Sequence, residues 1–534
     1  SRVPRGSSEG TNERTRACAQ EERSTDRLRR VATTSDASAL RRRLGSSFPT
    51  TLGATPLAQT QKLLVDQGTT FTNAFIHVPI CNPSRSTTLT GRYFHNIKAT
   101  GTPWANMHVD MNKVHNESFA VNFKEAGFAT ALIGKYANAM PDGFVPKGWD
   151  TWLANGGGDY ANPQFVSYNV PGLDDGNVQL WGNYTVAVVG NESVKFLNRQ
   201  LSSETPFLLY CAPKAVHEPF DPAPWHVGVW DDSWPDGPGP RGPAWNMTKE
   251  DRAKHAANVP TMPLISDEAA AVVTGVWKNR WRSLLSVDDV VAALVREVDA
   301  FGALDDTYFF YASDHGFQLG QLNMLMDKRH AYDWDTRIPF VVRGPGFGKG
   351  VADARPVTNV DLAPTFAALA GVAPRDDWDG RSLLETDDWR TSVLVEYYYN
   401  DANTKCVANC SNGTSYPDGD SYCTDLVSTP NDVCWGPGGN EDCNTECYPT
   451  ENDGNNFIAL RRLVGADVLY ARYQTGDQAA ADINFTAPDA HELFRTDADP
   501  WCVVNAYESA TGDELASLDG ELDAWFACAG AACP

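Results

Sequence analysis

The sequence has few basic residues for its length. Its 534 residues include 44 Lys and Arg against 68 Asp and Glu, which gives a formal net charge of −24 at pH 7. Nucleic acid and anionic membrane surfaces both require a broad basic face on a protein partner. The charge balance therefore argues against both, and an anionic small molecule would need a local pocket of positive charge.

Long apolar runs are missing as well. No stretch approaches the roughly 18 residues that a membrane helix requires, so we expect no membrane span. Residues 1–47 are polar and rich in arginine, as at Arg41–Arg43, and contain no apolar stretch typical of a signal peptide. We interpret residues 1–47 as a disordered or non-native N-terminal segment.

Cysteine, in contrast, is plentiful. Six of the twelve cysteines lie within residues 406–447, which is typical of a disulfide-stapled segment formed in an oxidising compartment. Asn-x-Ser/Thr sequences, which are glycosylation acceptors, point the same way. These are Asn116, Asn183, Asn191, Asn246, Asn409, Asn412 and Asn484. We therefore predict a glycoprotein that is secreted or in a lysosome-like compartment, with a Cys-rich acidic insertion at 401–455.

The most specific stretch is CNPSRSTTLTGR, from Cys81 to Arg92. Pro83 suits the start of a helix, where no backbone N–H is needed, and the amides that follow are left to face an anion. A buried cysteine that precedes a helix is the alternative interpretation. The Cys-x-Pro-Ser-Arg pentapeptide resembles the signature of the type I, formylglycine-dependent sulfatases, in which a formylglycine-generating enzyme oxidises the cysteine to an aldehyde.

Three further apolar runs indicate buried strands with polar residues just beyond them. Lys135 ends one run, His217 follows a second, and the pair Asp314-His315 follows a third. Open α/β sheets bind ligands at the carboxyl ends of their strands. Taken singly, each residue has a plainer interpretation, as a solvated strand end, a surface histidine or a turn.

The order of these residues, with Lys328 after them, is similar to that of the sulfatase active site. The resemblance implies a nucleophile made from Cys81, a proton donor to the leaving oxygen at His217, and three cations that hold the sulfate, which are Arg85, Lys135 and Lys328. It also implies one Ca²⁺, bound by residue 81, Asp314 and His315. Calcium prefers oxygen ligands, so His315 is the less suitable of these.

Other segments resemble one branch of the family. Ala137-Asn138 stands where many relatives have a histidine. The stretch Trp277–Val298 is similar in sequence to the N-acetylglucosamine-6-sulfatases and extracellular heparan sulfatases. Within that stretch, Ser286 resembles the N-cap of an amphipathic helix. The resemblance implies a sulfated carbohydrate or glycosaminoglycan as substrate, with Asn138 among its ligands.

One part of the pattern is absent. The family's first strand ends in two calcium-binding aspartates, but the corresponding position falls near Ser46-Ser47, and Asp36 is the nearest upstream acid. Nothing around Asp36 indicates a buried strand. We therefore expect the central strand and part of the calcium ligand set to be missing.

The fold class implied is α/β, an alkaline-phosphatase-like sandwich with a large central mixed sheet between helices. We expect a catalytic domain at 48–385 and a smaller α+β domain with an antiparallel sheet at 386–534. The leading hypothesis is a sulfatase acting on a sulfated sugar. The alternatives are a phosphonate or phosphate monoester hydrolase of the same superfamily and a catalytically impaired, glycan-binding relative.

Overall fold

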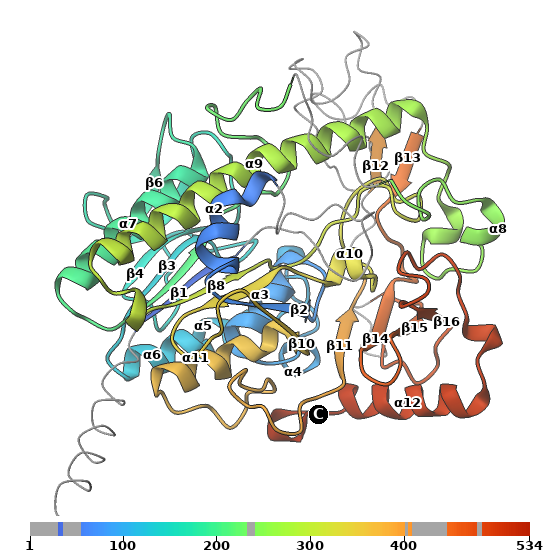
Figure 1. The fold of residues 1–534 in the computed structure, drawn as a ribbon. Coiled ribbons are helices and arrows are strands. Elements are labelled where there is room, and N and C mark those ends of the chain that lie inside the picture. Colours follow the sequence, from blue (N-terminus) through green and yellow to red (C-terminus); the bar gives the residue numbers. More distant parts are fainter. Residues whose placement is uncertain (1–29, 36–54, 232–240, 401–403, 408–445, 478–482) are drawn as a thin grey trace, which may run out of the picture.

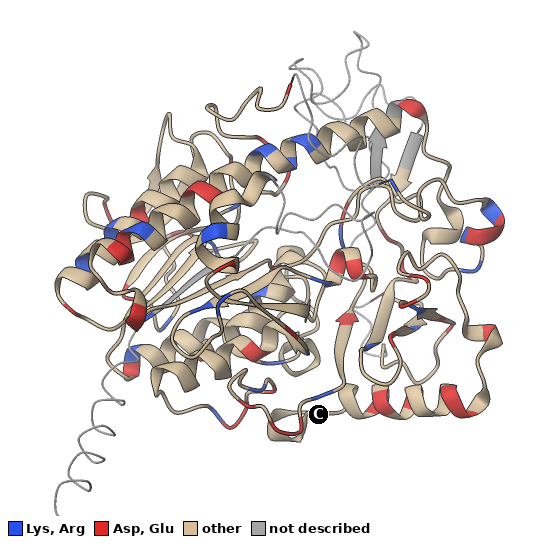
Figure 2. Cartoon of the chain, in the orientation of Figure 1, with Lys and Arg blue, Asp and Glu red and all other residues tan. Residues whose placement is uncertain are grey.

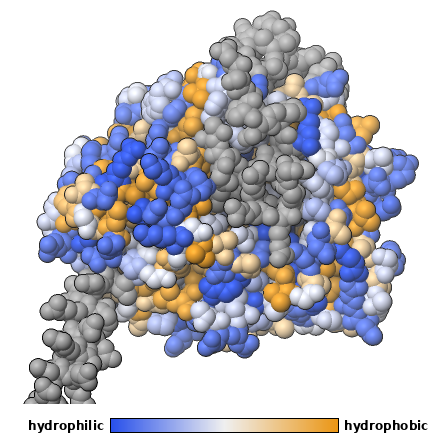
Figure 3. Space-filling view, in the orientation of Figure 1, coloured by the Kyte–Doolittle hydropathy of each residue, from blue (hydrophilic) through white to orange (hydrophobic). Residues whose placement is uncertain are grey.

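The computed structural model describes residues 30–35, 55–231, 241–400, 404–407, 446–477 and 483–534 (Figure 1). Within these residues no helix is both long enough and apolar enough to cross a membrane. On the face drawn in Figure 3, hydrophobic residues are scattered among hydrophilic ones. Acidic and basic residues are likewise spread along the helices and loops (Figure 2).

A sheet of ten strands forms the centre of the molecule. Its five middle strands, from β8 to β4, run parallel, and antiparallel pairs occur on both sides of them. Across the sheet the strands are β10 (Val351–Thr358), β2 (Thr69–Phe75), β9 (Phe340–Arg343), β8 (Tyr308–Ala312), β1 (Arg30–Ser35), β7 (Phe207–Ala212), β3 (Ala129–Lys135), β4 (Thr151–Asn155), β5 (Gln164–Tyr168) and β6 (Gly176–Gln179). The predicted large mixed sheet is confirmed.

Helices cover both faces of this sheet because its central strands are apolar on both sides. In β7, Leu208 and Tyr210 pack into one core cluster, whereas Phe207 and Leu209 pack into the other. One face is covered by α2 (Ala58–Thr60), α7 (Thr185–Ser202) and α9 (Asp267–Ala300) (Figure 1). The other is covered by α3 (Cys81–Thr90), α5 (Met111–Glu117), α6 (Phe119–Glu125) and α11 (Leu362–Ala370).

The longest helix begins earlier than the sequence indicates. Ser266 is the N-cap of α9, and its side chain accepts a hydrogen bond from the backbone N–H of Ala269 at 3.0 Å. Ser286, which resembles an N-cap, is buried inside the same 34-residue helix. The residues before Ser286 are thus helical, and they include side chains that reach the site described below.

The C-terminal region contains the predicted antiparallel sheet. Its four strands are β11 (Ser392–Tyr397), β14 (Asn456–Arg462), β15 (Val468–Gln474) and β16 (Ala490–Arg495), with α12 (Gly512–Phe526) alongside (Figure 1). A separate two-stranded ladder joins β12 (Thr404–Val407) to β13 (Glu446–Pro449). Residues 408–445, most of the Cys-rich insertion, lie outside the described residues. Three short helices, α4 (Phe94–Ile97), α8 (Lys249–Arg252) and α10 (Asp333–Thr336), lie in connecting segments.

The expectation that residues 1–47 lack a strand is wrong for residues 30–35. This segment forms β1, which pairs in parallel with β7 and β8 in the middle of the sheet. Its register places Thr34 opposite Cys211 and Ser35 opposite Ala312. The sequence RVATTS escapes recognition because it contains only two apolar residues and lies in a polar, arginine-rich segment. Asp36, Ser46 and Ser47 lie outside the described residues.

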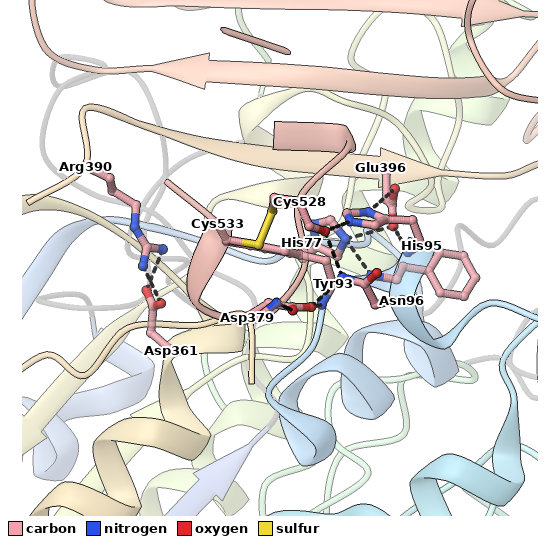
Figure 4. Close-up of a disulfide and its surroundings, with 12 residues drawn as sticks. His77, Tyr93, His95, Asn96, Asp361, Asp379, Arg390, Glu396, Cys528 and Cys533 are labelled. Atoms are coloured by element: carbon pink, nitrogen blue, oxygen red, sulfur yellow. Dashed lines mark hydrogen bonds and ion pairs between the residues drawn. A yellow bond between two sulfur atoms is a disulfide. The ribbon is translucent and has the colours of Figure 1, made fainter. Parts of the chain in front are cut away.

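Buried polar contacts join the two sheets beside α4 (Figure 4). Glu396 of β11 lies 3.0 Å from His77 Nε2 and 3.1 Å from His95 Nδ1. Burial alone would raise the pKa of Glu396, but the charges and hydrogen bonds of His95 and His77 hold it well below its ordinary value. Asp379 accepts hydrogen bonds from the backbone of Tyr93 at 2.7 Å and from the Asn96 side chain at 2.8 Å. Glu396 of the C-terminal sheet and Asp379 therefore together fix the turn that follows α3.

Close approach of β3 to β7 requires glycine at position 134. Gly134 has φ of +123°, and a Cβ there would lie 1.9 Å from the Ala212 carbonyl oxygen. We expect Gly134→Ala to destabilise the protein by about 3 kcal/mol or more, because the obstacle is backbone. Gly127→Ala is the control: its φ is +87°, but a Cβ there would meet nothing within 4 Å. It should cost only about 1–2 kcal/mol. Equal melting temperatures for the two variants would contradict the close-approach argument.

Candidate active site

The site is built around the first residue of α3. Ile80 precedes the helix in an extended conformation, Cys81 begins it, and Gly91 ends it with a left-handed φ of +64°. Pro83 is therefore the third helical residue rather than the first, still within the first turn, where its missing N–H costs nothing. The Cys81 side chain is buried. The free amides of this helix end and its positive dipole both face the position of Cys81.

The central strands bring four further predicted residues to this position. Lys135 is the last residue of β3, His217 lies in the loop after β7, and Asp314 and His315 follow β8. Parallel strands end at one edge of the sheet, so residues far apart in the sequence meet there. His315 Nε2 lies 3.3 Å from Cys81 Sγ, and both Lys135 and His217 are close enough to affect the pKa of the thiol.

Arg85, one turn into α3, links three parts of the site. Its guanidinium donates to the Asp314 carboxylate at 2.7 Å, to the Asn138 side-chain oxygen at 2.7 Å and to the Tyr136 carbonyl at 2.6 Å. Asp314 and Arg85 are both almost fully buried. A buried cation held in this way has a fixed direction, as recognition of an oxyanion requires.

Lysine charges dominate the electrostatics at Cys81. Burial alone would raise the pKa of the thiol, but the charges of Lys135, Lys328 and His315 lower it well below its ordinary value. The effect is reciprocal: burial would lower the pKa of Lys328, but the Cys81 and Asp327 charges raise it above its ordinary value. The site therefore favours negative charge at residue 81.

His217 is held as a neutral imidazole. Burial, followed by the charge of Lys135, lowers its pKa to about 4. Its Nδ1 lies 3.0 Å from the Glu218 carbonyl, which can only accept, so Nδ1 carries the proton and Nε2 the lone pair. The Tyr160 hydroxyl donates to the His217 carbonyl at 2.7 Å and fixes the loop.

A cavity opens beside these residues. Its lining includes three predicted residues and one basic residue that sequence reasoning missed, Arg280 of α9. The lining residues are Val216, His217, Glu218, Arg280, His315, Gly316, Phe317 and Lys328. Arg280 belongs to the stretch Trp277–Val298, which resembles the N-acetylglucosamine-6-sulfatases, but it precedes the helix predicted from Ser286, and no local motif distinguishes it.

The described residues do not complete a calcium site. Cys81, Asp314 and His315 each offer a ligand atom, and these atoms lie within 4.8 Å of one another. Ca²⁺ takes six to eight oxygen ligands, whereas this group contains one carboxylate, one imidazole and one sulfur. One oxygen of that carboxylate is also bonded to Arg85. These residues alone do not fit Ca²⁺.

Solved structures share this architecture. A protein solved with its substrate D-glucosamine-2-N,6-O-disulfate has a TM-score of 0.62 at 20% identity and covers 93% of this chain and 97% of its own. The phosphonate monoester hydrolase of Agrobacterium radiobacter has a TM-score of 0.57 at 17% identity and covers 93% of this chain and 94% of its own. The fold is thus the alkaline-phosphatase-like one.

Sequence comparison identifies the family. The sulfatase family profile matches residues 45–372, more than half of the chain, and the chain belongs to the sulfatase family. A Sulf-1 extracellular sulfatase homolog of Caenorhabditis elegans is 31% identical over 64% of this chain but only 49% of its own length. Bovine N-acetylglucosamine-6-sulfatase is 32% identical over 65% of this chain and 63% of its own. The goat enzyme is 28% identical over 90% of this chain and 82% of its own.

The charge environment of Cys81 can be tested on protein in which the thiol is unmodified. Because the pKa of Cys81 is lowered, its alkylation by iodoacetamide should remain fast below pH 8, where an ordinary thiol is protonated. Lys328→Met removes a nearby positive charge, so the pKa should rise and the reactivity profile should move to higher pH.

Lys195→Met, which changes an exposed lysine of α7, is the matched control and should leave the profile unchanged. Cys211 provides an internal reference, because burial raises its pKa to about 12 and it should not react. Identical profiles for the wild type and Lys328→Met would show that Lys328 does not act on residue 81.

Proposed function

We propose that this protein is a sulfuric ester hydrolase that removes sulfate from a sulfated sugar, with formylglycine at position 81 as its nucleophile. The observation that carries the proposal is a buried cysteine at a helix N-terminus, in the Cys-x-Pro-Ser-Arg sequence, surrounded by Lys135, Lys328, His217 and His315. Once Cys81 is converted, the hydrated aldehyde supplies one hydroxyl to attack sulfur and a second to release sulfate. In the structure, the thiol stands in the place of that group.

The surrounding cations suit an aldehyde hydrate and a sulfate better than a free thiol. Lys135, Lys328 and the amides of α3 present hydrogen-bond donors to oxygen atoms at this position. Charge that develops on the transferring sulfate is stabilised by lysine and arginine side chains already fixed in place. Arg85 belongs to this set, and Asn138 orients it by accepting from its guanidinium at 2.7 Å.

His217 is the proton donor to the departing oxygen. In the free site its pKa of about 4 leaves it neutral at pH 5 to 7. A bound sulfate ester brings negative charge beside it, and an opposite charge raises the pKa of an imidazole. The histidine therefore takes up its proton as the anionic substrate binds and gives it to the leaving alcohol.

The substrate and the compartment follow from the relatives. Matches to N-acetylglucosamine-6-sulfatases and to an extracellular sulfatase homolog support a sulfated sugar or glycosaminoglycan, and a secreted or lysosome-like location. Formylglycine formation would make the maturation enzyme a transient partner. Phosphonate or phosphate monoester hydrolysis remains the second enzyme activity to assay.

Residue 81 provides the decisive test. Protein made together with a formylglycine-generating enzyme should yield a peptide with the mass of an aldehyde at position 81, and it should hydrolyse 6-sulfated N-acetylglucosamine. Cys81→Ala should abolish turnover. Cys81→Ser should give at most a single turnover, because serine has no second hydroxyl on the same carbon. An unmodified thiol in active protein would overturn the mechanism, and modified protein active only on phosphonate esters would replace the substrate class.

His217 can be tested through the leaving group. His217→Gln should lower kcat for a sugar sulfate by about 10² to 10⁴. It should lower kcat much less for 4-methylumbelliferyl sulfate, whose phenolic oxygen leaves without protonation. His226→Gln is the control, because His226 lies in the same loop region and pairs instead with Asp289 at the surface, 2.9 Å away. Equal losses on both substrates would show that His217 is not the proton donor.

A further inference from the structure

Arg280 lines the cavity but has no role in the proposed reaction steps. In the proposed mechanism, the sulfate to be transferred is bound by Arg85, Lys135 and Lys328, which surround residue 81. Arg280 comes instead from the middle of α9 and lines the same cavity as Lys328 and His217. It is 7% exposed, so its charge is held almost entirely inside the protein.

The Arg280 guanidinium is fixed in position by its neighbours. It donates to the Val216 carbonyl at 3.0 Å, and its central carbon lies 4.2 Å from the centroid of the Phe317 ring. Val216 is the residue before His217, so the guanidinium is tied to the loop that carries the proton donor. Five N–H donors in a rigid plane allow arginine to serve a protein carbonyl and a ligand oxygen together.

Charge in the cavity wall is positive overall. Lys328 and Arg280 both lie near Phe317, with the Lys328 Nζ 5.7 Å from the ring centroid, and Glu218 is the acidic residue in the lining. Placing positive charge inside a protein of net charge −24 suits an anionic ligand.

We propose that Arg280 forms a second anion subsite, which binds a second anionic group on the sulfated sugar, an N-sulfate or a carboxylate. This rests on the proposed sulfatase function and narrows its substrate class to sugars with two anionic groups. Charge-assisted hydrogen bonds from a buried guanidinium are strong and directional, so the subsite discriminates between a charged and an uncharged substituent.

The test compares three sulfate esters in steady-state assays of the full chain. They are glucosamine-2-N,6-O-disulfate, N-acetylglucosamine-6-sulfate, and 4-methylumbelliferyl sulfate, which has neither the sugar nor the second anion. Arg280→Gln should lower kcat/KM for the disulfate by about tenfold to a hundredfold, mainly by raising KM. The two monosulfates should change little. A 6-sulfated disaccharide that contains a uronate distinguishes a carboxylate from an N-sulfate as the second anion.

Arg282→Gln is the matched control. Arg282 lies two residues further along α9 and is equally buried, but it pairs with Asp231 and donates to the Val229 carbonyl at 3.1 Å. This variant should preserve the preference for the disulfate. Arg280→Lys keeps the charge while losing the planar fork, and should fall between the wild type and Arg280→Gln.

Two outcomes would overturn the proposal. Equal losses on the two sugar esters, with 4-methylumbelliferyl sulfate little changed, would show that Arg280 only positions the His217 loop, and unchanged kcat/KM for the disulfate would show that it binds nothing. If the wild type hydrolyses none of the esters, the proposed sulfatase function fails, and this result is separate from a failure of the subsite.

Calorimetry then tests the subsite alone. With inorganic sulfate present to fill the catalytic pocket, the wild type should bind N-sulfoglucosamine more tightly than N-acetylglucosamine. Arg280→Gln should lose that preference, and a wild type without it would refute the subsite.

Discussion

Burial of positive charge around Cys81 is the constraint on which the rest of the structure depends. Removing cations from water costs several kcal/mol each unless nearby groups compensate for the lost hydration. Here Asp314 holds Arg85 at 2.7 Å, and Asp327 lies 3.4 Å from the ammonium of Lys328. The residual positive charge is directed at residue 81, where the bound sulfate would complete the balance. The site is thus organised for an anion before the anion arrives.

The fold meets this constraint by placing each charge on a rigid element. Lys135 ends a buried strand, Arg85 lies within a buried helix, and the His217 loop is fixed by Tyr160. The C-terminal sheet contributes indirectly to the position of α3, because Glu396 and its histidine partners hold the turn that follows this helix. A cation on a mobile loop would lose part of its binding energy to the entropy of ordering, which these placements avoid.

Sequence reasoning succeeded where chemistry and local pattern coincide. The apolar runs before Lys135, His217 and Asp314 are strands of the central sheet, and their ends meet at one edge, as parallel strands require. It failed where tertiary contacts determine the secondary structure or the position of a side chain. β1 is a strand because one neighbour on each side, β7 and β8, completes its hydrogen bonds, although RVATTS has little apolar character of its own. Arg280 escaped notice because an arginine inside an amphipathic helix has no local mark of function, and only packing against Val216 and Phe317 places it in the cavity.

Whether a metal ion can bind at Asp314 depends on the balance of charges around it. Its carboxylate already compensates Arg85, and His315 lies 3.6 Å from its other oxygen. A divalent cation here would compete with Arg85 for that carboxylate and would repel the nearby lysines, so it would need further oxygen ligands to offset both effects. β1 ends at Ser35, opposite Ala312, and therefore at the same edge of the sheet as Asp314. The central strand thus brings the chain to the side of the sheet where such ligands would be required.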